Sequence, residues 1–291
     1  MKKIKTSFSG HDKFDCKIDW IVKGLEAFNN DNKILLLSNI EKGIETLGLG
    51  INMIKSLNHW LKVFGLINDN GFTELGQMIL EKDPYLENTD ILWILHWNLV
   101  KNKENTTLYY MFFNQIYLYR FTKEDIFNNV SLWLEQNEIK LSPSTLKADI
   151  DVFLRMYNNT SNKDISMNLL SDLNILTQFN DKYILNINST VKISNDVFIY
   201  ILNDYIHTFK KANIESISID DIQRGEVSIQ KSLCMSENTL FSKINNISNI
   251  TNGSMSYSEA SGIRQIYINN TLNNHELLSN ILNKEVANVL L

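Results

Sequence analysis

The chain has 291 residues, of which 44% are hydrophobic and 21% charged, proportions typical of a folded globular protein. Its formal net charge of −5 excludes a protein that coats nucleic acid through overall charge, because non-specific DNA affinity comes mainly from neutralising phosphates. The two cysteines, Cys16 and Cys234, lie far apart and belong to no Cys/His cluster, so we expect no metal and no cofactor.

The N-terminal segment, through residue 14, is predicted to be an extended polar entry that ends in the motif FSGHDKF. It lacks the apolar core of a secretory signal, and the longest apolar run, residues 91–100, is too short to span a bilayer. We therefore expect a cytoplasmic protein with reduced thiols and no membrane contact.

The motif FSGHDKF gathers several chemically active residue types without a recognisable catalytic spacing. Its residues of interest are Ser9, Gly10, His11, Asp12, Lys13 and Phe14. Ser9 can cap a turn and Gly10 can permit a tight bend. These properties favour a structural lock, in which the motif holds the chain in one conformation. A ligand or partner contact and a catalytic role are the weaker alternatives.

The most informative stretch is LGLGINMIKSLNHWLKVFGLIN, residues 47–68. Helices are predicted at 15–29 and 33–46, after which Gly48 and Gly50 break the chain and a new helix runs from about Asn52 to Phe64. Gly65 then stands where glycine favours a helix end. The order of helices, followed by a short turn, predicts a winged helix-turn-helix.

The helix over residues 52–64 is predicted to be amphipathic. Its apolar side consists of Met53, Leu57, Trp60, Leu61 and Phe64. Its polar side consists of Asn52, Lys55, Ser56, His59 and Lys62. No acidic residue occurs between Glu45 and Asp69, so this polar side suits the major groove of double-stranded DNA. The alternative is a structural winged helix that makes no DNA contact.

Further along, Thr73 is predicted to cap a helix that ends before Pro84, and residues 91–100 are apolar all round, as in a buried helix. His96 in that helix is interpreted as a hydrogen-bonded core histidine. The aromatic run over residues 107–119 favours a helix, and Thr122 is expected to cap another.

The remaining chain repeats the theme of helices followed by hairpins. A helix opens at Ser142-Pro143, and a hairpin is predicted around Asn180–Asp181. The sequence predicts an amphipathic helix over residues 195–210. Ser236 is predicted to cap a further helix, which precedes a turn at Asn252-Gly253 and two short strands.

The predicted fold class is mainly α with short β-hairpins, in which a winged helix-turn-helix N-terminal module precedes further winged-helix-like modules. The modules are residues 1–86 (winged helix-turn-helix), 87–140 (helical linker), 141–192 (second winged-helix-like module) and 193–291 (helical and winged-helix-like). The acidic excess lies after residue 84, so a nucleic-acid contact is expected in the first module.

Several segments together resemble the bacterial and archaeal domain of unknown function family numbered 4007. The matching stretches include FSGHDKF, WIVKGLEAF, LGLGINMIKSLNHWLKVFGLI, DPYLENTDILWILHWNLV, SPSTLKADIDVFLRMY and SGIRQIY. Family members usually have Glu-Thr after the histidine, where this chain has Asp12-Lys13. The resemblance implies a genomic setting beside DNA-phosphorothioation and phage-defence genes, and it implies no catalytic residue.

These observations favour a non-enzymatic DNA-binding accessory or regulator in such a system, acting on double-stranded DNA with or without modification. The alternative is a protein-interaction scaffold that binds proteins of the same operon. A nuclease or sulfur-handling enzyme centred on His11 and Asp12 is a third and weaker hypothesis, because no known catalytic motif supports it.

Overall fold

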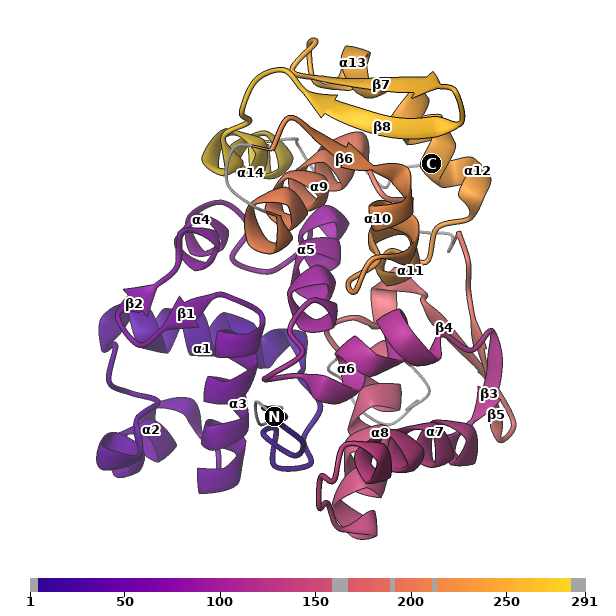
Figure 1. Ribbon diagram of the computed structural model, residues 1–291. Helices are drawn as coiled ribbons and strands as arrows, with labels where there is room; N and C mark the ends of the chain where they lie inside the picture. Colours follow the sequence, from indigo (N-terminus) through magenta and orange to yellow (C-terminus); the bar gives the residue numbers. More distant parts are fainter. Residues whose placement is uncertain (1–4, 159–166, 189–191, 211–213, 284–291) are drawn as a thin grey trace.

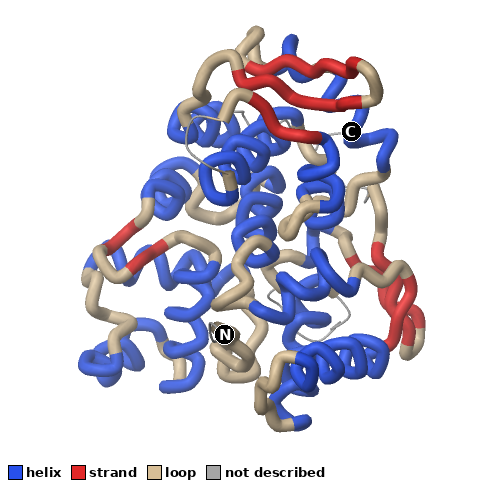
Figure 2. The backbone as a smooth tube through the Cα atoms, viewed as in Figure 1, coloured by secondary structure: helices blue, strands red, loops and turns tan. Residues whose placement is uncertain are grey.

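The computed structural model describes residues 5–158, 167–188, 192–210 and 214–283. Helices dominate, and three small antiparallel sheets lie at the periphery of the molecule (Figures 1 and 2). The predicted mainly α composition with short hairpins is therefore confirmed. None of the helices in these ranges combines the length and apolar composition needed to cross a membrane.

The N-terminal part contains four helices and one two-stranded hairpin. In chain order these are α1 (Ile18–Asn30), α2 (Ile40–Leu47), α3 (Ile51–Val63), β1 (Ile67–Asn68), β2 (Gly71–Phe72) and α4 (Glu74–Lys82). The helix predicted over 33–46 begins late, because a short 3-10 turn, η1 (Leu37–Asn39), precedes α2. Thr73 caps α4 as predicted, since its side chain accepts the Gly76 N–H.

The middle of the chain forms the centre of the molecule. Its elements are α5 (Thr89–Val100), α6 (Thr107–Met111), the π-helical turn η2 (Phe112–Ile116), β3 (Arg120–Thr122), α7 (Lys123–Gln136) and α8 (Pro143–Tyr157). Helix α5 is buried on nearly every side, as its uniform apolar sequence predicted. His96 on α5 contacts the Tyr157 hydroxyl at 2.8 Å and the Ser232 carbonyl at 2.6 Å, which confirms its interpretation as a core histidine.

The second sheet combines strands from distant parts of the sequence. The turn η3 (Ser171–Leu173) leads into β4 (Leu176–Phe179) and β5 (Lys182–Leu185), which form the predicted hairpin, with Asn180 in the left-handed conformation. Strand β3 adds to this hairpin in the order β3-β5-β4, with Phe121 opposite Tyr183. This sheet therefore joins residues from two of the predicted modules, whose boundaries remain a prediction.

The C-terminal part surrounds a second three-stranded sheet. Its elements are α9 (Asn195–Phe209), β6 (Ser216–Ser218), α10 (Ile219–Arg224), α11 (Ile229–Ser232), α12 (Glu237–Asn245), α13 (Ile247–Ile250), β7 (Met255–Ala260), β8 (Ile263–Ile268) and α14 (Asn274–Asn283). The strands pair in the order β6-β8-β7, and Ser236 caps α12 as predicted. Helix α14 packs against both α9 and α4, which links the two ends of the chain (Figure 1).

Candidate nucleic-acid interface

Glycine residues flank helix α3, and a wide sector of the helix is buried in the protein. Gly48 and Gly65 have φ angles of +65° and +73°, a backbone conformation that favours glycine, and they end α2 and reverse the chain after α3. The apolar side chains of Leu57, Trp60 and Leu61 are fully buried. The helix that was predicted between Gly50 and Gly65 is therefore present, with bounds shifted by one residue.

The five residues predicted on the polar side of α3 divide into two groups. Asn52, Lys55 and Lys62 are exposed, and the Lys62 ammonium lies 2.6 Å from the exposed carboxylate of Asp69. Asn52, Lys55 and Lys62 follow one stripe of the helix, since their spacings of three and seven residues return to the same side. They are the part of the predicted surface that a DNA duplex can reach.

The prediction that Ser56 lies on the exposed side of α3 is wrong. Its side chain is fully buried, and its hydroxyl has no hydrogen-bond partner among the described residues. Ser56 lies four residues before Trp60 and seven before Val63, both buried, so it shares their side of the helix. The buried sector of α3 is thus wider than the apolar residues alone indicated.

His59 is also largely covered, which corrects its predicted place on the DNA-facing side of α3. A Cβ added at Gly10 would lie 2.5 Å from the imidazole, so the motif loop passes directly over this side chain. Burial, assisted by the charge of nearby His11, lowers the pKa of His59 to about 4. The imidazole is therefore neutral at pH 7 and adds no charge to the surface of α3.

The loop formed by the motif FSGHDKF has an unusual backbone. Ser9, Asp12 and Lys13 have φ angles of +63°, +45° and +69°, in the left-handed region that side chains disfavour. Two tight turns accompany them, in which the N–H groups of Asp12 and Phe14 donate to the carbonyls of Ser9 and His11. A loop of this shape persists only when other contacts hold it.

Asp149 on α8 supplies the main contacts that hold this loop. Its Oδ1 accepts the Ser9 N–H at 2.6 Å and lies 2.9 Å from His11 Nε2, although that nitrogen is not aligned for a hydrogen bond. His11 and Asp149 are both buried. The His11 ring also stacks on the Trp60 indole of α3, with ring centroids 5.6 Å apart and planes within 9°.

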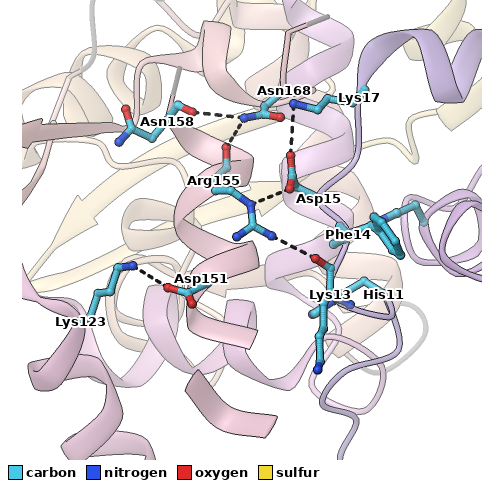
Figure 3. Close-up of polar contacts among 11 residues, drawn as sticks. His11, Lys13, Phe14, Asp15, Lys17, Lys123, Asp151, Arg155, Asn158 and Asn168 are labelled. Atoms are coloured by element: carbon cyan, nitrogen blue, oxygen red, sulfur yellow. Dashed lines mark hydrogen bonds and ion pairs between the residues drawn. The ribbon is translucent and has the colours of Figure 1, made fainter. Parts of the chain in front are cut away.

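A second set of contacts holds the end of the same loop (Figure 3). Arg155 on α8 donates to the Asp15 carboxylate at 2.7 Å and to the Lys13 carbonyl at 3.0 Å. Burial alone would raise the pKa of Asp15, but its hydrogen bond and charge interaction with Arg155 lower it. Trp60 Nε1 donates to the Phe14 carbonyl at 3.0 Å, so the loop joins α8 to α3.

These contacts are those that a structural lock requires, and any binding role of the motif stays a prediction. Sequence reasoning missed Asp149 and the lock contacts of Arg155, because both residues lie on α8, far along the chain from the motif. In the described part of the chain, no three His, Cys, Asp or Glu side chains converge as metal ligands. Cys16 and Cys234 are buried, and burial raises the pKa of both thiols.

Comparisons with known proteins agree on nearly the whole chain. A family model described as "Protein of unknown function (DUF4007)" matches residues 8–285. Two solved structures, "SspB crystal structure" and "Magnesium ion-bound SspB crystal structure", each share the fold with a TM-score of 0.80 at 20% sequence identity. Each match covers 95% of this chain and 86% of the other. The comparison with curated proteins gives no match.

Proposed function

The chain belongs to the DUF4007 family, and from that premise we propose that it is a non-enzymatic DNA-binding accessory or regulator of a DNA-modification or phage-defence system. The genomic setting that the family resemblance implies, beside DNA-phosphorothioation genes, supports double-stranded DNA as the partner. On this proposal, α2 and α3 act as a helix-turn-helix and the hairpin β1–β2 acts as the wing.

The observation that carries the proposal is the exposed stripe of α3. Asn52 and Lys55 are free to reach base edges or phosphates, and the exposed pair of Lys62 and Asp69 can open to give Lys62 a phosphate instead. A base contact from this stripe contributes about 1–3 kcal/mol of discrimination. Because the stripe holds only two cations, we expect weak and salt-sensitive binding.

Charge reversal on α3 tests this proposal. Lys55→Glu with Lys62→Glu should abolish the shift of a duplex in a gel at low salt, because two phosphate contacts become repulsions. In the unaltered protein, these two contacts should contribute about −2 to the slope of log affinity against log salt concentration. Lys140→Glu with Lys182→Glu makes the same change in net charge at exposed sites outside α3 and should preserve binding. Unchanged binding by the α3 variant would reject α3 as the DNA-contacting element.

A protein-interaction scaffold is the second candidate, and exposed apolar side chains near the sheet β3-β5-β4 favour it. Phe179, Tyr119 and Ile187 are 70%, 54% and 40% exposed. On this second proposal, these side chains belong to an apolar surface that binds another protein. Capture of proteins from the same operon separates the candidates. Capture that survives nuclease treatment supports the scaffold, whereas capture that is lost with the DNA supports the first proposal.

A further inference from the structure

We infer that a cleft between α12 and residues 192–194, which directly precede α9, binds a small organic anion. The cleft has a volume of about 510 Å³, which is within the range of small-molecule sites. Helix α12, which lines this cleft, lies at the end of the molecule opposite to α3, so the site is separate from the proposed DNA surface (Figure 1).

The charged side chains that line the cleft itself are cations. Lys192 and Lys243 both line it, and none of the described residues in its wall is Asp or Glu, although the chain as a whole is acidic. The Lys243 ammonium donates to the Ile193 carbonyl at 2.8 Å and to Asn195 Oδ1 at 3.0 Å. These two bonds fix the position of the charge at the wall of the cleft.

Burial lowers the pKa of Lys243, while the nearby carboxylates of Asp90 and Asp196 act in the opposite direction. A partly desolvated ammonium gains more from an incoming anion than a fully hydrated one does, because it has already lost part of its water. Lys192 is exposed at the same cleft and adds a second, more mobile positive charge.

The rest of the lining fits a ring or another apolar body joined to the anionic group. Trp93, Leu233, Met235 and Ile250 supply an apolar wall. The Trp93 indole N–H is buried and has no hydrogen-bond partner among the described residues, which is uncommon for a tryptophan inside a protein. The combination of an apolar wall and a few fixed polar groups is typical of small-molecule sites.

Two residues in the wall of the cleft have a disfavoured backbone conformation. Asn188 and Cys234 have φ angles of +55° and +48°, and Asn188 N–H donates to the Cys234 carbonyl at 2.8 Å. The Asn188 side-chain oxygen accepts the Ser236 N–H and the Thr239 hydroxyl, each at 2.9 Å. Asparagine tolerates this conformation but cysteine does not favour it, and such strained residues cluster at ligand sites.

The test uses the full chain labelled with 5-fluorotryptophan, because the ¹⁹F resonance of Trp93, assigned with Trp93→Phe, reports directly from the cleft wall. The probes are 2-naphthoate, 2-naphthyl phosphate and uncharged 2-naphthol, which share one ring system and differ in the charged group. We expect at least one anion to shift the Trp93 resonance in a saturable way, with affinity at least tenfold above that of 2-naphthol. The stronger of the two anions identifies carboxylate or phosphate as the preferred group.

Lys243→Gln should weaken anion binding at least tenfold. Lys192→Gln, which removes the exposed lysine of the cleft, should also weaken it. Ser242→Trp, which fills the cleft without a charge change, should abolish it, and Lys140→Gln should leave it unchanged. The thermal unfolding midpoint of each variant shows that it is folded. A Trp93 resonance that does not respond to either anion at millimolar concentration would overturn the inference, as would binding that is equal for 2-naphthol or insensitive to both lysine substitutions.

Discussion

Asp149→Ala should lower the free energy of unfolding by about 2–4 kcal/mol and release the motif loop from the body of the protein. The substitution removes the acceptor of the Ser9 N–H and leaves the buried imidazole of His11 without its neighbouring carboxylate. Losing one partner of a buried polar contact costs more than the contact itself contributes, because the other partner stays desolvated. Urea unfolding gives the stability change, and faster trypsin cleavage after Lys13 reports the released loop.

The same helix offers a matched control for this experiment. Asp151 pairs with Lys123 on α7, but both side chains are about half exposed, so Asp151→Ala should cost less than about 1 kcal/mol (Figure 3). Asp149→Asn keeps an oxygen for the Ser9 N–H and should fall between the two. Equal stability of Asp149→Ala and Asp151→Ala would show that Asp149 does not lock the loop.

Release of the motif loop would also affect α3, the helix that we propose contacts DNA. His11 and Gly10 cover the His59 and Trp60 side chains, and Trp60 donates to the Phe14 carbonyl. If the stripe of α3 binds DNA, Asp149→Ala should weaken that binding less than charge reversal does, because the cations themselves remain.

Local signals in the sequence predicted most of the elements. Caps such as Thr73, Thr122 and Ser236 act within three residues, and each is observed with its expected hydrogen bond. The turn at Asn180 follows from the ease with which asparagine adopts the left-handed conformation. The burial of α5 follows from its uniform apolar composition.

Features that depend on distant partners could not be predicted in this way. The periodicity of α3 identifies one apolar side, but it carries no information about the loop that covers His59 from a position about 50 residues earlier. The same limit applies to Ser56. Its residue type assigns it to the polar side of the helix, although in the structure it shares the buried side with Trp60. The pairing of β3 with β5 and the contact of His11 with Asp149 likewise join segments that no local pattern connects.

A large pH effect should come from His96. Burial lowers its pKa to about 4, against the smaller opposing effect of its bond to the Ser232 carbonyl, whereas an unfolded histidine titrates near pH 6.5. Between these values the unfolded chain binds the proton and the native protein does not. The free energy of unfolding should therefore fall on acidification, by about 2 kcal/mol at pH 5 and about 3 kcal/mol at pH 4, and the loss from this group should level off below pH 4.

Several groups define the pH range in which this effect is best measured. His59 acts in the same direction, because its pKa is also lowered to about 4. Burial raises the pKa of Asp83 and Asp172, so these two groups increase the free energy of unfolding on acidification, at pH values just above the ordinary pKa of an aspartate. Asp15, whose pKa is lowered, decreases the free energy of unfolding only at lower pH. Urea unfolding between pH 7 and pH 5 therefore isolates the histidines from most carboxylate titration.

One variant and one titration assign the effect to particular side chains. His59→Gln should flatten part of the pH dependence, because it removes one of the two histidines whose pKa is lowered to about 4. His96 itself is followed by the NMR titration of its imidazole, which avoids a substitution that would strand the Tyr157 hydroxyl and the Ser232 carbonyl in the core. An imidazole of His96 that titrates near pH 6.5 in the native protein would contradict the prediction. One that stays neutral to pH 5 would show that the native protein disfavours a charged imidazole at the centre of α5.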